Sequence, residues 1–164
     1  MRIKGSMKIL FLDVDGVLNS AMYEPIKQQT EFQFIDESRL TLLKEIISRT
    51  KAEIVLTSTW RDCWNVDYDK CDNDGKYLTN ILKKYGLHIY DTTTYSEQYY
   101  MRPKEITKWL AGTNEYIDSY AILDDDSFEW GFHKNRVIRT FPSTTRGLEP
   151  NIAEQTIKIL NNEF

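Results

Sequence analysis

The sequence of 164 residues predicts an α/β domain in which helices cover both faces of a parallel sheet, a doubly wound arrangement. The first observation is the apolar run at residues 9–12, which lacks alternation and is typical of a strand buried on both faces. The second is that further short apolar segments alternate along the chain with helical patterns. This alternation is expected for parallel strands joined by right-handed helical crossovers.

The first helix is predicted to begin after Asp36, whose side chain suits an N-cap. Its apolar positions follow at helical spacing: Leu40, Leu43, Ile46 and Ile47. Residues 17–34, which lie between the first strand and this helix, have the mixed pattern of an extended excursion or hairpin. We therefore expect this segment to lie over the strand ends.

The remaining elements follow in the order strand, helix, strand, helix, strand, strand, helix. Their predicted ranges are 52–56, 77–85, 88–90, 103–112, 120–123, 136–140 and 152–160. Gly86 and Gly112 are stop signals for the helices before them, and Pro103 suits a first helical position. The polar residues 62–75 and the residues 91–100 are predicted to be loops.

The composition is that of an ordinary globular domain, with 41% hydrophobic residues and a formal net charge of −4. This charge gives no overall basic footprint for nucleic acid. No apolar run approaches the ~20 residues needed to span a bilayer, and no secretory signal is visible, so we expect a cytoplasmic protein. An effector secreted without a signal would have the same features. We interpret residues 1–6 as an added leader before Met7, and residues 7–164 as one domain.

The two cysteines, Cys63 and Cys71, fall in one polar segment and are predicted to be reduced thiols. A zinc site would need two more ligands, and His88 and His133 lack a matching spacing. The sequence Asp-Asn-Asp-Gly at 72–75 does not fit the register of a calcium-binding loop, so we expect a turn before a helix there.

Carboxylates follow two of the predicted strands directly. Asp13 and Asp15 come after the first strand, with Gly16 next, and Asp124 and Asp125 follow the strand at 120–123. Ligands of open α/β sheets gather beyond the carboxyl ends of the strands. Three adjacent acids at 124–126 would repel one another unless a divalent cation offset their charge. We therefore expect a metal site at this edge.

The segment Asp13-Val14-Asp15-Gly16-Val17, preceded by its apolar strand, resembles the first motif of the haloacid dehalogenase (HAD) superfamily. Most members of this superfamily are Mg-dependent phosphohydrolases. The resemblance implies a Rossmann-like HAD fold, here with a short flap and no large cap domain. Asp15 points to phosphate hydrolysis, since dehalogenases and transport ATPases of the superfamily place other residues there.

The resemblance also implies roles for these residues. Asp13 would attack phosphorus to form an aspartyl-phosphate, and Asp15 would protonate the leaving oxygen and then deprotonate water. Side chains two positions apart in an extended chain share a face, which suits this pairing. Thr57 or Ser58 would bind a phosphoryl oxygen, and both remain open.

The basic residue of the family is expected at Lys104, with Arg102 as the alternative. The expected Mg²⁺ ligands are Asp13, the backbone carbonyl of Asp15, and Asp124, with Asp125 binding directly or through water. Arg61, Arg102 and Gly16 are expected to contact the substrate.

A site without a cap resembles those of protein and polynucleotide phosphatases, whose substrates are too large to enclose. Aromatic residues are candidate platforms at the rim: Trp60, Trp64, Tyr95, Tyr99, Tyr100 and Trp130. We favour a phosphorylated protein, and phosphotyrosine in particular, as the substrate and partner. The oligomeric state is left open.

Three alternatives to a phosphoprotein remain. The run Thr-Ser-Thr-Trp-Arg at residues 57–61 is similar to HAD domains associated with RNA repair, so the end phosphate of a polynucleotide is the second candidate. Small metabolites come third. An alternative of another class is a catalytically idle HAD fold that serves as a binding module.

Overall fold

A computed structural model of the protein describes residues 5–20, 34–96 and 101–163. Five strands form one sheet in the order β3-β2-β1-β4-β5, and every neighbouring pair is parallel. Their bounds are β1 Ser6–Leu12, β2 Glu53–Leu56, β3 Ile89–Thr92, β4 Tyr116–Asp124 and β5 Val137–Arg139. The predicted α/β class with a parallel sheet is confirmed.

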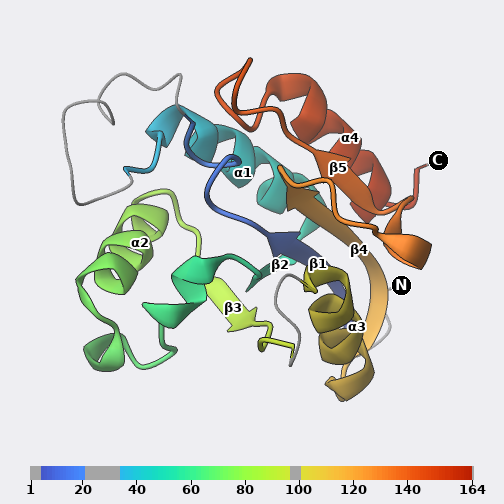
Figure 1. The fold of residues 1–164 in the computed structure, drawn as a ribbon, viewed down its shortest axis with the longest axis horizontal. Helices are drawn as coiled ribbons and strands as arrows, with labels where there is room; N and C mark the ends of the chain where they lie inside the picture. Colours follow the sequence, from blue (N-terminus) through green and yellow to red (C-terminus); the bar gives the residue numbers. More distant parts are fainter. Residues whose placement is uncertain (1–4, 21–33, 97–100, 164) are drawn as a thin grey trace.

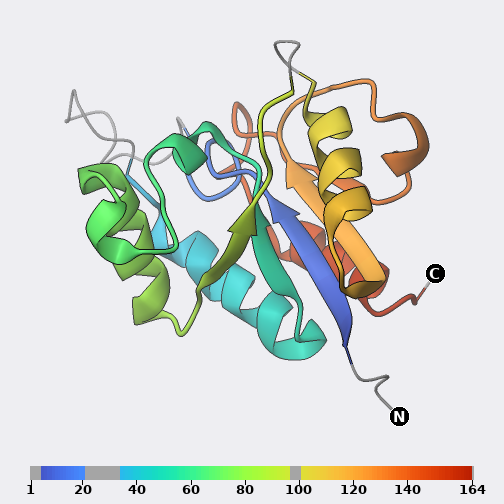
Figure 2. The ribbon, with the colours of Figure 1, turned by 90° about the horizontal axis from the view of Figure 1, so that it is seen from below.

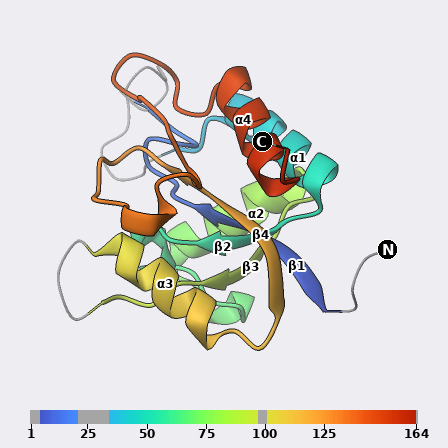
Figure 3. The ribbon, with the colours of Figure 1, turned by 90° about the vertical axis from the view of Figure 1, so that its right-hand side faces the viewer.

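Helices cover both faces of this sheet (Figure 1). Their bounds are α1 Glu37–Thr50, α2 Asn73–Lys84, α3 Arg102–Gly112 and α4 Pro150–Leu160. Helices α1 and α4 pack against each other on one face, and α3 lies on the other, as Figure 3 shows edge-on. The Rossmann-like, doubly wound arrangement is thus confirmed, with no large cap domain in the described part of the chain.

Strand β1 is the centre of the core. Leu10 and Leu12 join the cluster formed with α1, α2 and α4, whereas Ile9 and Phe11 point to the opposite side and pack with Ile106 of α3. All four strand residues are 0–1% exposed. Because successive side chains of a strand point to opposite faces, burial of both sets explains the unbroken apolar run.

The carboxyl ends of the three central strands are level with one another. Leu12 pairs with Leu56 of β2 and with Leu123 of β4. The next backbone groups continue this register, since Asp13 N–H donates to the Leu123 carbonyl and Thr57 N–H to the Leu12 carbonyl, both at 3.0 Å. Figure 2 shows these strand ends meeting at one edge of the sheet. The polar residues that follow the strands are therefore brought together there.

Several elements begin earlier in the chain than predicted. Strand β1 begins at Ser6, within the range interpreted as a leader, because Ser6 pairs with Tyr116 at the extended start of β4. Helix α2 begins at Asn73, not at residue 77, since the Asp72 side chain accepts from the backbone N–H groups of residues 74 and 75. The polar Asp-Asn-Asp-Gly run is thus a cap and first helical turn.

The predicted flap at 17–34 is only partly covered, because residues 21–33 lie outside the described residues. The predicted loop at 91–100 starts too early, since β3 continues to Thr92, and residues 97–100 also lie outside the described part. Among the helices that the structure does describe, none combines the length and apolar character needed to cross a membrane.

Candidate active site

Three carboxylates converge beyond the ends of β1 and β4. One carboxylate oxygen each from Asp13, Asp124 and Asp125 lie within 4.8 Å of one another. Asp13 is 5% exposed and Asp124 is fully buried. Such an all-oxygen set of donors is the kind that Mg²⁺ prefers.

The electrostatics of this group favour a bound cation. Burial raises the pKa of Asp13 well above its usual range, and the neighbouring charges of Asp124 and Asp125 raise it further. Burial also raises the pKa of Asp124, although Arg102 opposes that shift. Because close carboxylates disfavour their joint ionisation, a divalent cation among them would stabilise the charged forms. The residues present thus fit a metal ion.

Arg102, the first residue of α3, meets two of these carboxylates. Its Nη1 lies 2.7 Å from Oδ2 of Asp124 and 3.4 Å from Oδ1 of Asp13. Burial lowers the pKa of Arg102, but its attraction to Asp13 and Asp124 outweighs burial, so the net shift is upward. The side chain also lies over the Phe128 ring, 5.5 Å from its centroid. The guanidinium is thus fixed and charged beside Asp13.

Asp15 is held by two neutral donors. Trp60 Nε1–H and the Asn19 side-chain amide each donate to Asp15 Oδ1 at 3.0 Å. Asn19 Oδ1 in turn accepts from the Gly16 N–H at 3.0 Å. Asn19 was not predicted as a site residue from the sequence. Trp60 was predicted at the rim, whereas it is only 8% exposed.

Gly16 is required by both its conformation and its surroundings. Its φ is +86°, and a Cβ built on it would lie 2.3 Å from Oδ2 of Asp125. A side chain would therefore be strained and would displace that carboxylate. The Gly16 carbonyl also accepts from Thr140 Oγ1 at 2.7 Å, which ties this turn to the end of β5.

Thr57 and Ser58 differ in how their hydroxyls are used. Ser58 Oγ accepts from the Trp60 N–H at 3.2 Å and caps the short 3₁₀ turn Thr59–Asp62. Thr57 Oγ1 is buried and has no hydrogen-bond partner within the described structure. A buried hydroxyl without a partner costs free energy unless a ligand supplies one. Of the two hydroxyls, that of Thr57 is therefore the one that the described structure leaves for a ligand.

For two other cations expected at the site, the described structure shows no pairing with the clustered carboxylates. Lys104 is exposed on α3, and among the described residues the cation that pairs with Asp13 and Asp124 is Arg102. Arg61 was expected at an open rim, but its side chain is 5% exposed and pairs with Glu105 at 3.0 Å. Its Nη1 also donates to Thr93 Oγ1. In this structure Arg61 thus joins α3 to the loops after β2 and β3, and its expected contact with the substrate stays a prediction.

The aromatic candidates for the rim occupy different places. Tyr95 is half exposed and lies against Arg61, with 3.6 Å from its ring centroid to the guanidinium carbon. Trp130 packs edge-on against Phe128. Tyr99 and Tyr100 lie outside the described residues.

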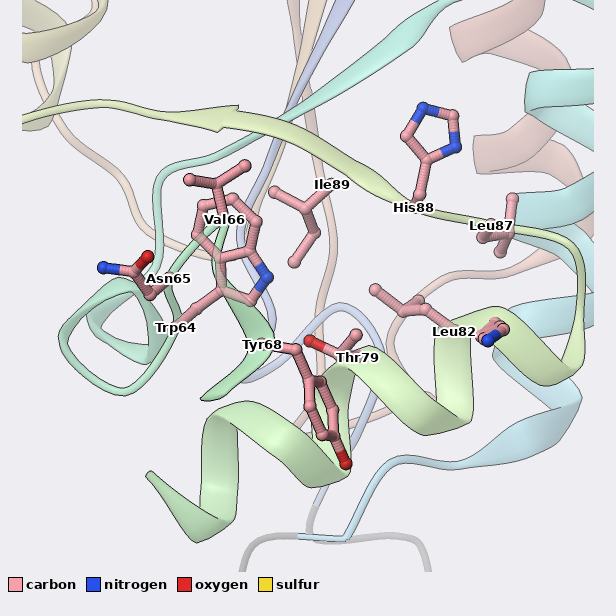
Figure 4. Close-up of a pocket in the computed structure, with 10 residues that line it drawn as sticks. Trp64, Asn65, Val66, Tyr68, Thr79, Leu82, Leu87, His88 and Ile89 are labelled. Carbon is pink, nitrogen blue, oxygen red and sulfur yellow. The ribbon is translucent and has the colours of Figure 1, made fainter. Parts of the chain in front are cut away.

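Trp64 lines a cavity of about 310 Å³ between α2 and β3 (Figure 4). Leu82 of α2 and Ile89 of β3 also line this cavity, and none of the three clustered carboxylates does. It is thus separate from the carboxylate group.

A second group of possible ligand atoms belongs to Cys63, Asp72 and Asp74. The carboxylate of Asp72 is already used to cap α2. Burial, and then the hydrogen bond to Asp72, raise the pKa of Cys63 to about 11, so its thiol keeps its proton at neutral pH. With one carboxylate used as a helix cap and a thiol that stays protonated, this group is less suited to bind a cation than the three carboxylates beyond β1 and β4. Both cysteines are free, as predicted.

The comparisons with known proteins agree with this geometry. The family model that describes the HAD domain in Swiss Army Knife RNA repair proteins matches residues 9–151, which include all the strands after the start of β1 and every aspartate of the site. No curated protein and no solved structure matches the chain. The match covers most of the chain, so the protein belongs to the family of HAD domains found in Swiss Army Knife RNA repair proteins.

Proposed function

We propose that this HAD domain is a Mg²⁺-dependent phosphatase that hydrolyses a phosphomonoester through an aspartyl-phosphate on Asp13. The observation that carries the proposal is the group formed by Asp13, Asp124 and Asp125, whose carboxylate oxygens lie within 4.8 Å of one another. Arg102 supports it, because its Nη1 pairs with both Asp13 and Asp124. Two cationic partners, an arginine and a metal ion, suit the charge of a bound phosphoryl group.

In this mechanism a carboxylate oxygen of Asp13 attacks phosphorus, and the bond from phosphorus to the ester oxygen breaks. Asp15 donates its proton to that leaving oxygen. Asp15 then takes a proton from water as the water oxygen attacks phosphorus, which frees Asp13 and releases inorganic phosphate. The donors Trp60 and Asn19 orient Asp15 for both proton transfers.

The remaining residues bind and neutralise the phosphoryl group. Thr57 Oγ1, which has no partner in the described structure, donates to a phosphoryl oxygen. Arg102 replaces Lys104 as the basic residue that stabilises charge beside Asp13. Asp13, Asp124 and Asp125 and the backbone carbonyl of Asp15 would hold Mg²⁺, which would supply charge neutralisation at the phosphoryl group.

For the substrate, we propose the terminal phosphate of an RNA strand. The family description names RNA repair, and the Thr-Ser-Thr-Trp-Arg run already pointed to this alternative. Our preference for a phosphorylated protein has no support from that match. The absence of a large cap from the described structure suits a polymer end, which must enter from one side.

The test is Mg²⁺-dependent phosphate release from four substrates in parallel: 3′-phosphorylated RNA, 5′-phosphorylated RNA, a phosphotyrosine peptide and a phosphoserine peptide. Asp13→Asn is the catalytic variant. Asp118→Asn is its matched control, since Asp118 is an exposed residue near the start of β4, at the other end of the sheet. Chelation by EDTA and restoration by Mg²⁺ complete the design.

We expect release from one RNA end that is lost with Asp13→Asn or EDTA and kept with Asp118→Asn. Release from a peptide and not from RNA would overturn the proposed substrate but keep the phosphatase. Release from none of the four substrates would favour the idle binding module. Equal activity of Asp13→Asn and the wild type would overturn the mechanism.

A further inference from the structure

An exposed cation and an exposed aromatic ring lie together at the end of β5. Arg139 is the last residue of that strand, and its Nε–H donates to the backbone carbonyl of Asp125 at 3.0 Å. The guanidinium carbon lies 5.1 Å from the centroid of the Phe141 ring, and Phe141 is 50% exposed. Arg139 is exposed as well. We call these two residues the β5 shelf.

Thr140, which lies between Arg139 and Phe141, connects the β5 shelf to the carboxylate site. Thr140 Oγ1 donates to the Gly16 carbonyl at 2.7 Å, and Thr140 N–H donates to the Asp124 carbonyl at 2.9 Å. Thr140 is 1% exposed, so its position is fixed. The shelf therefore flanks the turn that carries Asp15 and the loop that carries Asp125.

Arg139 differs from Arg102 in what its guanidinium can do. Arg102 is mostly buried, with a 14% exposed side chain, and it is neutralised by Asp13 and Asp124. Arg139 uses Nε for a backbone carbonyl, and no described residue accepts a hydrogen bond or an ion pair from its two Nη atoms. The Nη atoms of this exposed side chain thus keep their donors for a ligand, and the contact with the Phe141 ring restrains the guanidinium.

We propose that the β5 shelf binds the nucleotide next to the terminal phosphate of a single-stranded RNA substrate. The Nη atoms of Arg139 bind the adjoining phosphodiester, and Phe141 stacks with the base of that nucleotide. This assignment rests on the proposed function, since it requires a polymer whose terminal phosphate enters at Asp13. Because the net charge of the chain is −4, RNA is not attracted to the protein as a whole, and a local cation at this edge helps to bind its phosphates.

The test compares a substrate that reaches the shelf with one that does not. A terminally phosphorylated RNA tetranucleotide contains the adjoining phosphodiester, whereas 4-nitrophenyl phosphate lacks it. The variants are Arg139→Ala and Phe141→Ala. Their matched controls are Lys158→Ala, exposed on α4, and Tyr116→Ala, 61% exposed at the start of β4. Both controls lie toward the opposite end of the sheet, where Lys8 of β1 meets Asn161.

For each shelf variant we expect kcat/KM with the tetranucleotide to fall about tenfold, as for one charged hydrogen-bonded contact or one stacked base. The rate with 4-nitrophenyl phosphate stays within about twofold of the wild type, and both controls stay near it with either substrate. For Arg139→Ala, the slope of log affinity against log salt concentration also becomes shallower by about 0.7.

Binding of a fluorescein-labelled tetranucleotide to the Asp13→Asn protein, followed by anisotropy, measures the shelf without turnover. If wild-type protein releases no phosphate from RNA but the shelf variants still weaken binding in this background, the proposed phosphatase function fails, and the shelf stands as an RNA-binding surface. If Arg139→Ala and Lys158→Ala bind the tetranucleotide equally well, the shelf is overturned whatever the phosphatase assay gives.

Discussion

The indole Nε1–H of Trp60 donates a hydrogen bond of 3.0 Å to Oδ1 of Asp15, across 45 residues of sequence. The bond joins the short 3₁₀ turn after β2 to the turn after β1. It fixes the carboxylate that we propose as the general acid and base. A typical hydrogen bond contributes about 0.5–1.5 kcal/mol, so its loss is expected to be measurable.

Trp60→Phe keeps an aromatic ring near Tyr77, whose centroid is 6.4 Å away, but removes the donor. We expect kcat with 4-nitrophenyl phosphate to fall about tenfold, which corresponds to about 1.4 kcal/mol. Asn19 still holds Asp15, so activity is not abolished. Trp64→Phe is the matched control because Trp64 lines the separate cavity. An equal loss in the two variants would contradict the role of the Trp60 bond.

Arg102 and Lys104 provide a direct test of which cation serves the site. Arg102→Ala leaves Asp13 and Asp124 without their positive partner, so we expect kcat/KM to fall at least about 100-fold. Lys104→Ala, at an exposed position two residues later, should remain within about twofold of the wild type. Steady-state kinetics on the two variants measures which of the two cations supports catalysis. A large loss in Lys104→Ala alone would restore the sequence-based assignment.

Thr57 and Ser58 should separate catalysis from stability. Thr57→Val removes a buried hydroxyl that has no partner in the described structure, so the free energy of unfolding is expected to stay the same or rise while kcat falls about tenfold or more. Ser58→Ala removes a cap and should lower the free energy of unfolding by about 1 kcal/mol. Urea denaturation and kinetics measure the two effects. The reverse pattern would show that Ser58 is the phosphoryl-binding residue.

His133 is predicted to make stability depend on pH. Thr107 Oγ1–H donates to the Pro103 carbonyl at 3.0 Å, so its oxygen accepts from His133 Nε2–H at 2.8 Å, and Nδ1 accepts from the Tyr120 hydroxyl at 2.7 Å. The ring is 1% exposed. Burial lowers the pKa of His133 below its usual value. The folded protein thus holds a neutral imidazole.

The sign follows from proton binding. Below about pH 6.5 the unfolded chain protonates this histidine before the folded protein does, so the contribution of His133 to stability falls as pH falls. The loss is at most about 1.4 kcal/mol per pH unit and stops below the folded pKa. We expect the difference in unfolding free energy between wild type and His133→Gln to shrink from pH 7.5 to pH 5.5 in urea titrations. A difference that does not change with pH would contradict the prediction.

The strands and the acids at their ends could be predicted from the sequence because their signals are local. Residues 9–12 are apolar at every position, and such an unbroken run indicates a strand that is buried on both faces. The resemblance to the first HAD motif begins at the next residue, Asp13. Element starts were less accurate. Ser6 and Tyr116 pair with each other as strand residues, and both lie outside the apolar runs from which the strands were predicted.

The cations show why the site could be predicted only in part. Arg61, Arg102 and Lys104 are all polar residues near predicted strand or helix ends. Arg61 is neutralised by Glu105, Arg102 by Asp13 and Asp124, and Lys104 remains exposed. Which carboxylate each cation meets depends on how α3 packs on the sheet, and spacing along the chain does not contain that information.

The sequence alone determined the α/β class, the HAD resemblance and the aspartates at the strand ends. These features could be predicted because apolar patterns and a short motif are formed by residues that are close together in the sequence. The tertiary structure decided which side chains meet. The register of β1 with β2 and β4 sets Asp13 beside Asp124 and Thr57, and the packing of α3 brings Arg102 to them. Hydrogen bonds form at about 3 Å and close ion pairs within about 4 Å, so they select partners only after the long-range packing has brought their atoms within reach.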